Sequence, residues 1–187
     1  MKKGEFITSD THFGHSNVIR YSNRPFKNVD EMDHELIQNW NKKVPSGSIV
    51  YHNGDFSLCK KGRTIEILKQ LNGTIRLIRG NHDKKNIKGE IEQHYFDWVK
   101  DYYESKTEDG TLIVMSHYAF RVWNKSHYGS INLFGHSHGS LKDLKNRQMD
   151  VGVDTHPNYE PYSFYEIMEI MKNRKTKPVD HHGNRNR

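Results

Sequence analysis

The segment TIRLIRGNHD, residues 74–83, alternates apolar and polar side chains and then changes abruptly to a glycine followed by three polar residues. The alternation predicts a β-strand, and Gly80 marks its end. In open α/β sheets, ligands bind beyond the carboxyl ends of the strands. The amide of Asn81, the imidazole of His82 and the carboxylate of Asp83 are therefore expected at a functional edge, where they can bind a metal or transfer a proton.

Four other strand-like runs end in the same manner, at residues 5–9, 48–52, 111–115 and 130–134. The polar clusters that follow them are Asp10-Thr11-His12, Gly54-Asp55, Ser116-His117 and Gly135-His136-Ser137-His138. Each cluster alone is common, because such residues also occupy ordinary turns. Five clusters at five strand ends predict that side chains distant in the sequence converge at one site.

The remaining pattern indicates a single α/β domain. A helix is predicted over residues 30–40, where apolar residues recur at four-residue spacing, and a shorter one over residues 64–71. Ser163 followed by Glu166 is a capping-box pair that predicts the start of a last helix. Strands and helices alternate early and strands dominate later, which favours a sandwich with mixed sheets over residues 1–172.

The composition is that of a polar globular chain. It has 187 residues, of which 33% are apolar and 11% aromatic, and its mean hydropathy is −0.96. No apolar run is long enough for a membrane span, so no membrane partner is expected. The single cysteine, Cys59, cannot form an intramolecular disulfide, and the N-terminus lacks a signal-peptide pattern. We therefore expect a cytoplasmic protein, with an oligomeric state that the sequence leaves open.

The net charge of +6 is concentrated at the C-terminus. Residues 172–187 hold six Lys or Arg and one Asp and carry +5, which leaves +1 for the rest of the chain. Bulk charge thus gives no support for a polyanion-binding face on the body. We expect residues 173–187 to form a basic tail that is disordered, at least from Pro178 onward.

The five clusters have the chemistry of a dinuclear metal site. Carboxylate, carboxamide and imidazole without thiolate suit Mn²⁺, Fe²⁺, Ni²⁺, Co²⁺ or Zn²⁺. Two such ions need roughly eight protein contacts besides water, and one carboxylate can serve both ions. The clusters offer seven candidate ligands, so one bridging carboxylate completes the set.

The motif order D-x-H, GD, GNHD, H and GHxH, from Asp10 to His138, resembles the calcineurin-like metallophosphoesterase superfamily. The stretch from Asp10 to His15, followed by Asn23-Arg24-Pro25-Phe26, resembles a small bacterial and phage branch of phosphoesterases. The resemblance implies a four-layer α-β-β-α sandwich of two mixed β-sheets flanked by helices. It also implies a hydrolase with two divalent metal ions, for which Mn²⁺ is the expected species.

The resemblance assigns a role to each matching position. The implied ligands are Asp10, His12 and His138 for the first ion, Asn81, His117 and His136 for the second, and Asp55 as the bridge. A water or hydroxide between the ions would attack phosphorus in line. His82 would be the general acid for the leaving oxygen, and Asp83 would orient it through its other ring nitrogen.

Three further residues are candidate substrate contacts. Arg20 and Arg24 follow the first metal motif, and a guanidinium can bind phosphate through two hydrogen bonds. Surface charge is an equally good interpretation of both. His15 lies three residues after the motif and is expected to face the substrate.

Three functions remain open. The favoured one is hydrolysis of a small phosphodiester or phosphomonoester, such as a nucleotide or cyclic nucleotide, because the chain has no room for a domain that would cover the site. A protein phosphatase is disfavoured, since Asp83 stands where that branch has Glu after GNH. A nuclease is the alternative, motivated by the basic tail and by aromatic residues that could stack on bases: Tyr102, Tyr103, Trp123 and Tyr128. A non-catalytic module would require lost ligands, and every motif is present.

Overall fold

The computed structural model describes residues 4–142, 144 and 146–184 and contains two mixed β-sheets. The first sheet has the strand order β4-β3-β2-β1-β9. Its strands are β1 (Glu5–Thr8), β2 (Ile49–His52), β3 (Thr74–Ile78), β4 (Trp98–Lys100) and β9 (Tyr162–Ser163). The strands β1 to β4 are parallel, and β9 pairs antiparallel with β1. The carboxyl ends of β1, β2 and β3 therefore lie at one edge.

The second sheet is built from one contiguous part of the chain, in the order β5-β6-β7-β8. Its strands are β5 (Tyr103–Lys106), β6 (Leu112–Met115), β7 (Ile131–Phe134) and β8 (Gln148–Asp150). The strands β6, β7 and β8 are parallel, and β5 runs antiparallel to β6. This sheet brings the residues that follow β6 and β7 to the same edge of the molecule.

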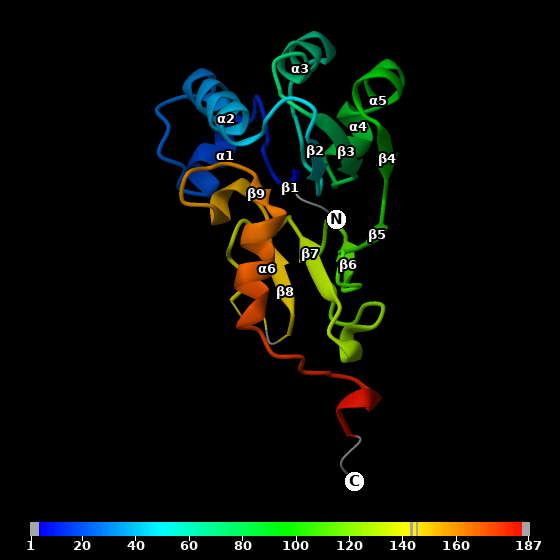
Figure 1. The fold of residues 1–187 in the computed structure, drawn as a ribbon. Coiled ribbons are helices and arrows are strands. Elements are labelled where there is room, and N and C mark those ends of the chain that lie inside the picture. Colours follow the sequence, from blue (N-terminus) through cyan, green and yellow to red (C-terminus); the bar gives the residue numbers. More distant parts are fainter. Residues whose placement is uncertain (1–3, 143, 145, 185–187) are drawn as a thin grey trace.

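Helices flank the sheets, and the predicted α/β sandwich is confirmed (Figure 1). The α-helices are α1 (Ser16–Tyr21), α2 (Val29–Lys43), α3 (Lys61–Leu68), α4 (Asp83–Asn86), α5 (Glu90–Tyr95) and α6 (Phe164–Lys172). Three 3-10 turns are η1 (Ser126–Tyr128), η2 (Val153–Thr155) and η3 (His181–Asn184). In Figure 1, α2, α3 and α5 lie on the side of the first sheet that faces away from the second. No helix in the described part of the chain is long and apolar enough to cross a membrane.

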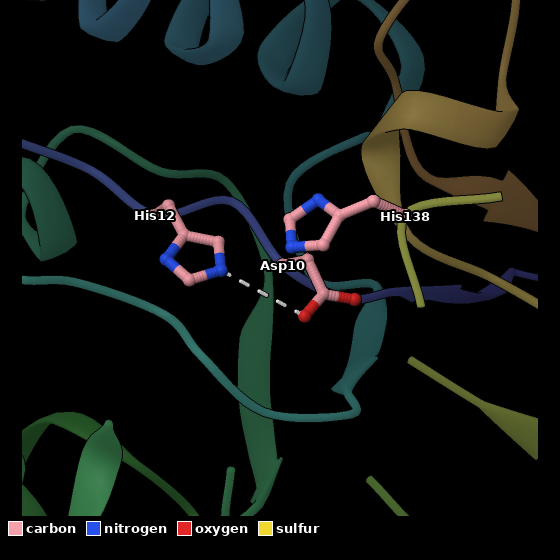
Figure 2. A group of neighbouring side chains, drawn as sticks. All are labelled: Asp10, His12 and His138. Atoms are coloured by element: carbon pink, nitrogen blue, oxygen red, sulfur yellow. Dashed lines mark ion pairs between the residues drawn. The ribbon is translucent and has the colours of Figure 1, made fainter. Parts of the chain in front are cut away.

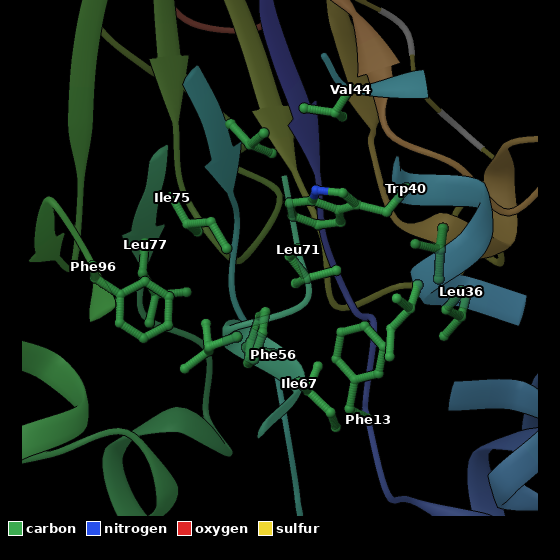
Figure 3. Close-up of a cluster of buried hydrophobic side chains, with 14 of the residues drawn as sticks. Phe13, Leu36, Trp40, Val44, Phe56, Ile67, Leu71, Ile75, Leu77 and Phe96 are labelled. Carbon is green, nitrogen blue, oxygen red and sulfur yellow. The ribbon is translucent and has the colours of Figure 1, made fainter. Parts of the chain in front are cut away.

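The outer core lies between the first sheet and these helices (Figure 3). Trp40 of α2 is fully enclosed there, and its indole N–H donates to the carbonyl of Asn72 at 2.9 Å. Val50 and Leu77 point into this core from β2 and β3. Because side chains alternate along a strand, their neighbours Tyr51 and Ile78 point the other way.

The inner core lies between the two sheets. It joins Tyr51 and Ile78 of the first sheet to buried apolar residues of β6, β7 and α6. The helix α6 begins with the predicted capping box, in which Ser163 accepts from the Glu166 backbone N–H and Glu166 accepts from that of Ser163. The cap orients the apolar face of α6, including Ile167, into this core.

The segment beyond α6 follows the second sheet. Arg174 donates to the carbonyl of Gln148 at 2.6 Å, and the ring of His182 stacks on that of His127. The domain boundary at residue 172 and the disorder of the tail stay predictions, and residues 185–187 lie outside the described part. His156, which belongs to none of the five motifs, is buried beside Glu160.

Candidate metal centre

The ends of five strands meet and bring together two groups of potential metal ligands. One group is Asp10, His12 and His138, and its ligand atoms lie within 4.8 Å of one another (Figure 2). The other group is Asp55, His117 and His136, which meets the same distance limit. Each group combines residues from both sheets, so the site exists only where the sheets meet.

Asp55 connects the two groups. Its Oδ2 lies 3.6 Å from Nε2 of His12 and 3.5 Å from Nε2 of His117. Asn81 joins the second group, with its Oδ1 at 3.1 Å from Nε2 of His117. The other ring nitrogen of His117 donates to the carbonyl of Asn53 at 2.8 Å, which turns Nε2 toward the site. All seven candidate ligands from the sequence therefore converge.

The backbone of the site is strained. Among the residues that the structure describes, eight non-glycine residues have a positive φ. Five of them belong to the candidate ligand set, with φ between 46° and 67°: Asp10, His12, Asp55, His136 and His138. This left-handed region is unfavourable for residues with a Cβ and persists only where the surroundings enforce it. Neighbouring loops do so here, because Asp10 N–H donates to Gly54 and His12 N–H to the carbonyl of Asp55.

Gly54 and Gly80 are required by the same crowding. A Cβ on Gly80 would lie 2.2 Å from Oδ1 of Asp55, and one on Gly54 would lie 2.5 Å from the backbone nitrogen of Gly80. Gly54 also has a φ of +96°. Only glycine lets these two loops approach closely enough for Asp55 and Asn81 to share the site.

Several polar atoms of the first ligand group are buried without a hydrogen-bond partner in the described part of the chain, which is the condition expected of a cation site. Asp10 Oδ1 and both ring nitrogens of His12 are buried with no hydrogen-bond partner among the described residues. Burial raises the pKa of Asp10 to about 7 and lowers that of His12 to about 2. A neutral His12 beside a carboxylate is the ligand state that a divalent ion binds, and the ion would supply the missing partner.

In the second ligand group, Asp55 and His117 stabilise each other's charged forms. Burial opposes its ionisation, but the hydrogen bond and charge of His117 lower the pKa of Asp55 to about 2. Burial likewise lowers the pKa of His117, yet its hydrogen bond to Asp55 and the charges of Asp10 and Asp55 raise it to about 9. The site thus concentrates negative charge that His117 balances in part. The donor set and the unpartnered atoms fit divalent metal ions.

The sequence of the chain agrees with this geometry. A family model described as calcineurin-like phosphoesterase matches residues 6–185. The chain belongs to the calcineurin-like phosphoesterase family. The predicted resemblance is confirmed, and with it a family whose members are metal-dependent phosphoesterases.

Two other proteins are similar to this chain over most of its length. The chain is 34% identical over 178 residues to the uncharacterized protein MJ1445 of Methanocaldococcus jannaschii, covering 91% of this chain and 92% of that one. It is also similar to the crystal structure of the protein of unknown function AQ665 from Aquifex aeolicus, with a TM-score of 0.69 and 25% identity. That likeness covers 89% of this chain and 98% of the other.

Asp83 has a different position from the one predicted. It is fully buried, and its two oxygens accept from the backbone N–H groups of Asp55, Phe56 and Gly80 at 2.7 to 2.9 Å. The His82 ring makes no hydrogen bond to it, so the prediction that Asp83 orients this imidazole is wrong. The carboxylate instead joins the Gly80 loop to the Asp55 loop, which fixes where the candidate ligands lie.

Arg24 is likewise a structural residue and no substrate contact. Its guanidinium is buried and donates to both oxygens of Asp154, at 2.7 and 2.8 Å, and to the carbonyls of Asp10 and Thr11. Its fifth N–H donates to Sδ of Met32 at 3.4 Å, so no donor of the guanidinium is left for a phosphate. Asp154, which sequence reasoning missed, also accepts from Nδ1 of His138 at 2.6 Å. Its only signal in the sequence is its place after a short strand.

A large cavity adjoins the first ligand group. Its volume is about 740 Å³. Its lining includes His12, His15, Tyr21, His82, His136, His138 and Lys142. The His82 side chain is 41% exposed, and its Nε2 lies 3.9 Å from Oδ2 of Asp55. His82 and His15 both line this cavity, and their roles toward a substrate stay predictions.

A smaller cavity of about 330 Å³ adjoins the second ligand group. Its lining includes Arg79, Asn81, Lys84, Asp101, His117 and Tyr118. The Tyr118 hydroxyl donates to Oδ1 of Asn81 at 3.4 Å. Sequence reasoning missed this tyrosine and Tyr21, because neither belongs to a motif. The aromatics it did name lie elsewhere: Trp123, for example, is buried and donates to the carbonyl of Ser130.

Arg20 occupies an intermediate position. It is exposed, and its guanidinium lies over the Tyr21 ring, 5.3 Å from the centroid. Tyr21 lines the large cavity, whereas Arg20 does not. Arg20 therefore stays a candidate for contact with the outer part of a substrate, held there by its cation-π contact.

Proposed function

We propose that this protein is a phosphoesterase with a dinuclear metal centre that hydrolyses a small phosphodiester or phosphomonoester of nucleotide type. The observation that carries the proposal is the position of Asp55 between two ligand groups, 3.6 Å from His12 and 3.5 Å from His117. A single group of three ligands would support one ion. Two groups with a shared carboxylate support a pair.

We assign the ligands as the geometry groups them. Asp10, His12 and His138 would hold one ion, and Asn81, His117 and His136 the other, with Asp55 bridging. When bound, the ions would lower the pKa of water and neutralise charge on the phosphate oxygens. Mn²⁺ is the first ion to test, because oxygen and nitrogen donors without thiolate suit it. The lone Cys59 supports our further proposal of a cytoplasmic location.

We assign the general acid to His82. Its backbone N–H donates to Oδ1 of Asp55 at 2.9 Å, which fixes the residue beside the ligand groups while its imidazole faces the large cavity. A proton donor at the accessible side of the centre can reach the oxygen that leaves. The anchor is the backbone, so the ring keeps both nitrogens for proton transfer.

Hydrolysis of bis-p-nitrophenyl phosphate with added Mn²⁺ tests the proposal. The wild-type protein should release nitrophenol and hold two ions per chain by elemental analysis. Asp55→Asn should lose the second ion and reduce kcat/KM by at least about a hundredfold, because the amide cannot serve two cations. Asp30→Asn, at the exposed start of α2, is the matched control. A variant that keeps two ions would show that Asp55 is no bridge, and an inactive wild type with every divalent ion would exclude the enzyme.

The nuclease alternative is separated by substrate size. The same protein should hydrolyse mononucleotides, cyclic nucleotides or dinucleotides faster than oligonucleotides. Removal of residues 173–187 should leave those rates unchanged, because the tail carries most of the positive charge but its described residues, 173–184, line neither cavity next to the centre. A strong preference for oligonucleotides that is lost with the tail would favour the nuclease.

A further inference from the structure

The two cavities beside the metal centre meet at the centre itself. Two consecutive residues lie on opposite sides of the boundary between the cavities: Asn81 lines the small cavity and His82 lines the large one. His117 and His136 divide in the same way, and their ring centroids are only 5.2 Å apart. A phosphate bound to the centre would therefore have room for a substituent in each cavity.

Each cavity presents an exposed tyrosine. Tyr21 in the large cavity is 67% exposed and meets His15 edge-on, with ring centroids 6.4 Å apart. Tyr118 in the small cavity is 49% exposed and rests against His117 at 5.0 Å. Exposed rings that other rings hold in place offer stacking surfaces for planar groups such as nucleobases.

The charges of the linings suit an anionic or polar ligand. The described residues that line the large cavity include Lys142 and several imidazoles but no carboxylate. The small cavity is lined by the exposed Lys84 and by a single carboxylate, that of Asp101. Arg79 also lines this cavity, but its guanidinium donates hydrogen bonds to Glu92 and to the carbonyl of Ile87. Both cavities have volumes in the usual range for bound small molecules, about 300–1,000 Å³.

We infer that the substrate is a phosphodiester with a planar organic group on each side of phosphorus, and that the leaving group occupies the Tyr21 cavity. The inference rests on the proposed function. His82 determines which cavity holds the leaving group. A general acid must contact the oxygen that leaves, and of the two cavities His82 lines only the large one. The group that stays on phosphorus then occupies the Tyr118 cavity.

The reaction balances as a hydrolysis. The bond between phosphorus and the leaving oxygen breaks, its electron pair stays on that oxygen, and the oxygen takes a proton from His82. A water oxygen forms the new bond to phosphorus, and one of its protons is released and replaces the proton that His82 gave. The products are an alcohol from the Tyr21 cavity and a phosphomonoester whose organic group lies against Tyr118.

Three esters with one leaving group test the preference for diesters. Thymidine 5′-p-nitrophenyl phosphate, methyl p-nitrophenyl phosphate and p-nitrophenyl phosphate differ only in what remains on phosphorus. The thymidine ester should exceed the methyl ester in kcat/KM by about tenfold, the contribution of one stacked base. A monoester hydrolysed as fast as the thymidine ester would overturn the inference while leaving the phosphoesterase intact. Hydrolysis of none of them would instead refute the proposed function.

Two tyrosine variants test which cavity holds the leaving group and which holds the group that stays on phosphorus. Tyr118→Ala should raise KM for the thymidine ester by about tenfold and change the methyl ester much less, because only the thymidine ester places a base there. Tyr21→Ala should raise KM for both esters alike, because both place nitrophenol in that cavity. Tyr118→Phe and Tyr21→Phe keep the rings and should restore binding. Tyr165→Ala, an exposed tyrosine of α6 that lines neither cavity, is the matched control.

A binding measurement supplies a readout without turnover. Thymidine 5′-monophosphate is the expected product that keeps the retained group, and calorimetric titration into the Mn²⁺-loaded protein measures its affinity. Tyr118→Ala should weaken it about tenfold, and Tyr21→Ala less than twofold. A selective effect of Tyr21→Ala on this product and on the thymidine ester would reverse the direction, and no effect of either variant would overturn the two-cavity inference.

Discussion

At the scale of single residues, the site combines side chains of two kinds. The candidate ligands have unfavourable backbone geometry and unpartnered polar atoms, as at Asp10 and His12. Two charged residues beside them, Asp83 and Arg24, instead have their polar atoms occupied by partners within the protein. The first kind is shaped for a ligand from outside, and the second for holding the loops of the protein together.

Only the first kind was predictable from the sequence. Asp55 and His117 stand in motifs whose spacing follows from strand ends, so their convergence follows from topology. The roles of Asp83 and Arg24 depend on which buried backbone atoms need a partner, and no local pattern encodes that. Asp154 is hidden for the same reason: it meets His138 and Arg24 only after the chain has crossed 16 and 130 residues, respectively.

Asp154 should control the affinity of the first ion. Asp154→Asn removes the charge that holds Nδ1 of His138 and so loosens the orientation of Nε2 toward the ion. Mn²⁺ affinity measured by equilibrium dialysis should fall by about 10- to 100-fold at one of the two sites. Asp109→Asn, on an exposed turn, is the control. Unchanged affinity at both sites, in a variant whose melting temperature is retained, would show that Asp154 serves only Arg24.

At the scale of elements, periodic patterns were predictable and short segments were not. The helix α2 and the strands β1, β2 and β3 coincide closely with the predictions, because each buries a face with a clear period. The strand β9 has two residues and α4 has four, too few to establish any period. Such segments form because neighbouring elements supply their hydrogen bonds and packing.

The capping box of α6 should contribute measurably to stability. Ser163→Ala removes the hydroxyl that accepts from the Glu166 backbone N–H and leaves that donor without its partner. The free energy of unfolding should fall by about 1 kcal/mol in urea denaturation. Ser46→Ala, at an exposed turn, provides the baseline for the same side-chain change. A loss as small as that of the control would mean that packing alone positions α6.

At the scale of the whole molecule, contacts distant in sequence connect the ends of the fold. Lys43 at the end of α2 donates to Glu160 at 3.0 Å and to Glu166 at 2.8 Å. These contacts join the outer helix layer to the last helix. Burial opposes ionisation of Glu166, but the hydrogen bonds from Lys43 and Ser163 outweigh it and lower its pKa to about 2.

This pKa predicts a defined pH window for the stability of the fold. A carboxyl group whose pKa is lower in the folded state stabilises that state above its ordinary pKa of 4.5 and loses the contribution as the pH falls toward about 2. Glu166→Gln should therefore be less stable than the wild type at pH 6, and the difference in melting temperature should shrink between pH 4.5 and pH 2. A difference that stays constant with pH would contradict the assignment.

The division of the ligands between two sheets also has a consequence for synthesis. A ribosome releases the chain from its N-terminus, so Asp10, His12, Asp55 and Asn81 emerge while His117, His136 and His138 are still unmade. A nascent chain therefore presents acidic loops without the imidazoles that complete the centre. The strand β9, which closes the first sheet beside β1, emerges later still. We therefore expect the proposed metal centre to be completed late in synthesis, because its last imidazoles emerge after the acidic loops.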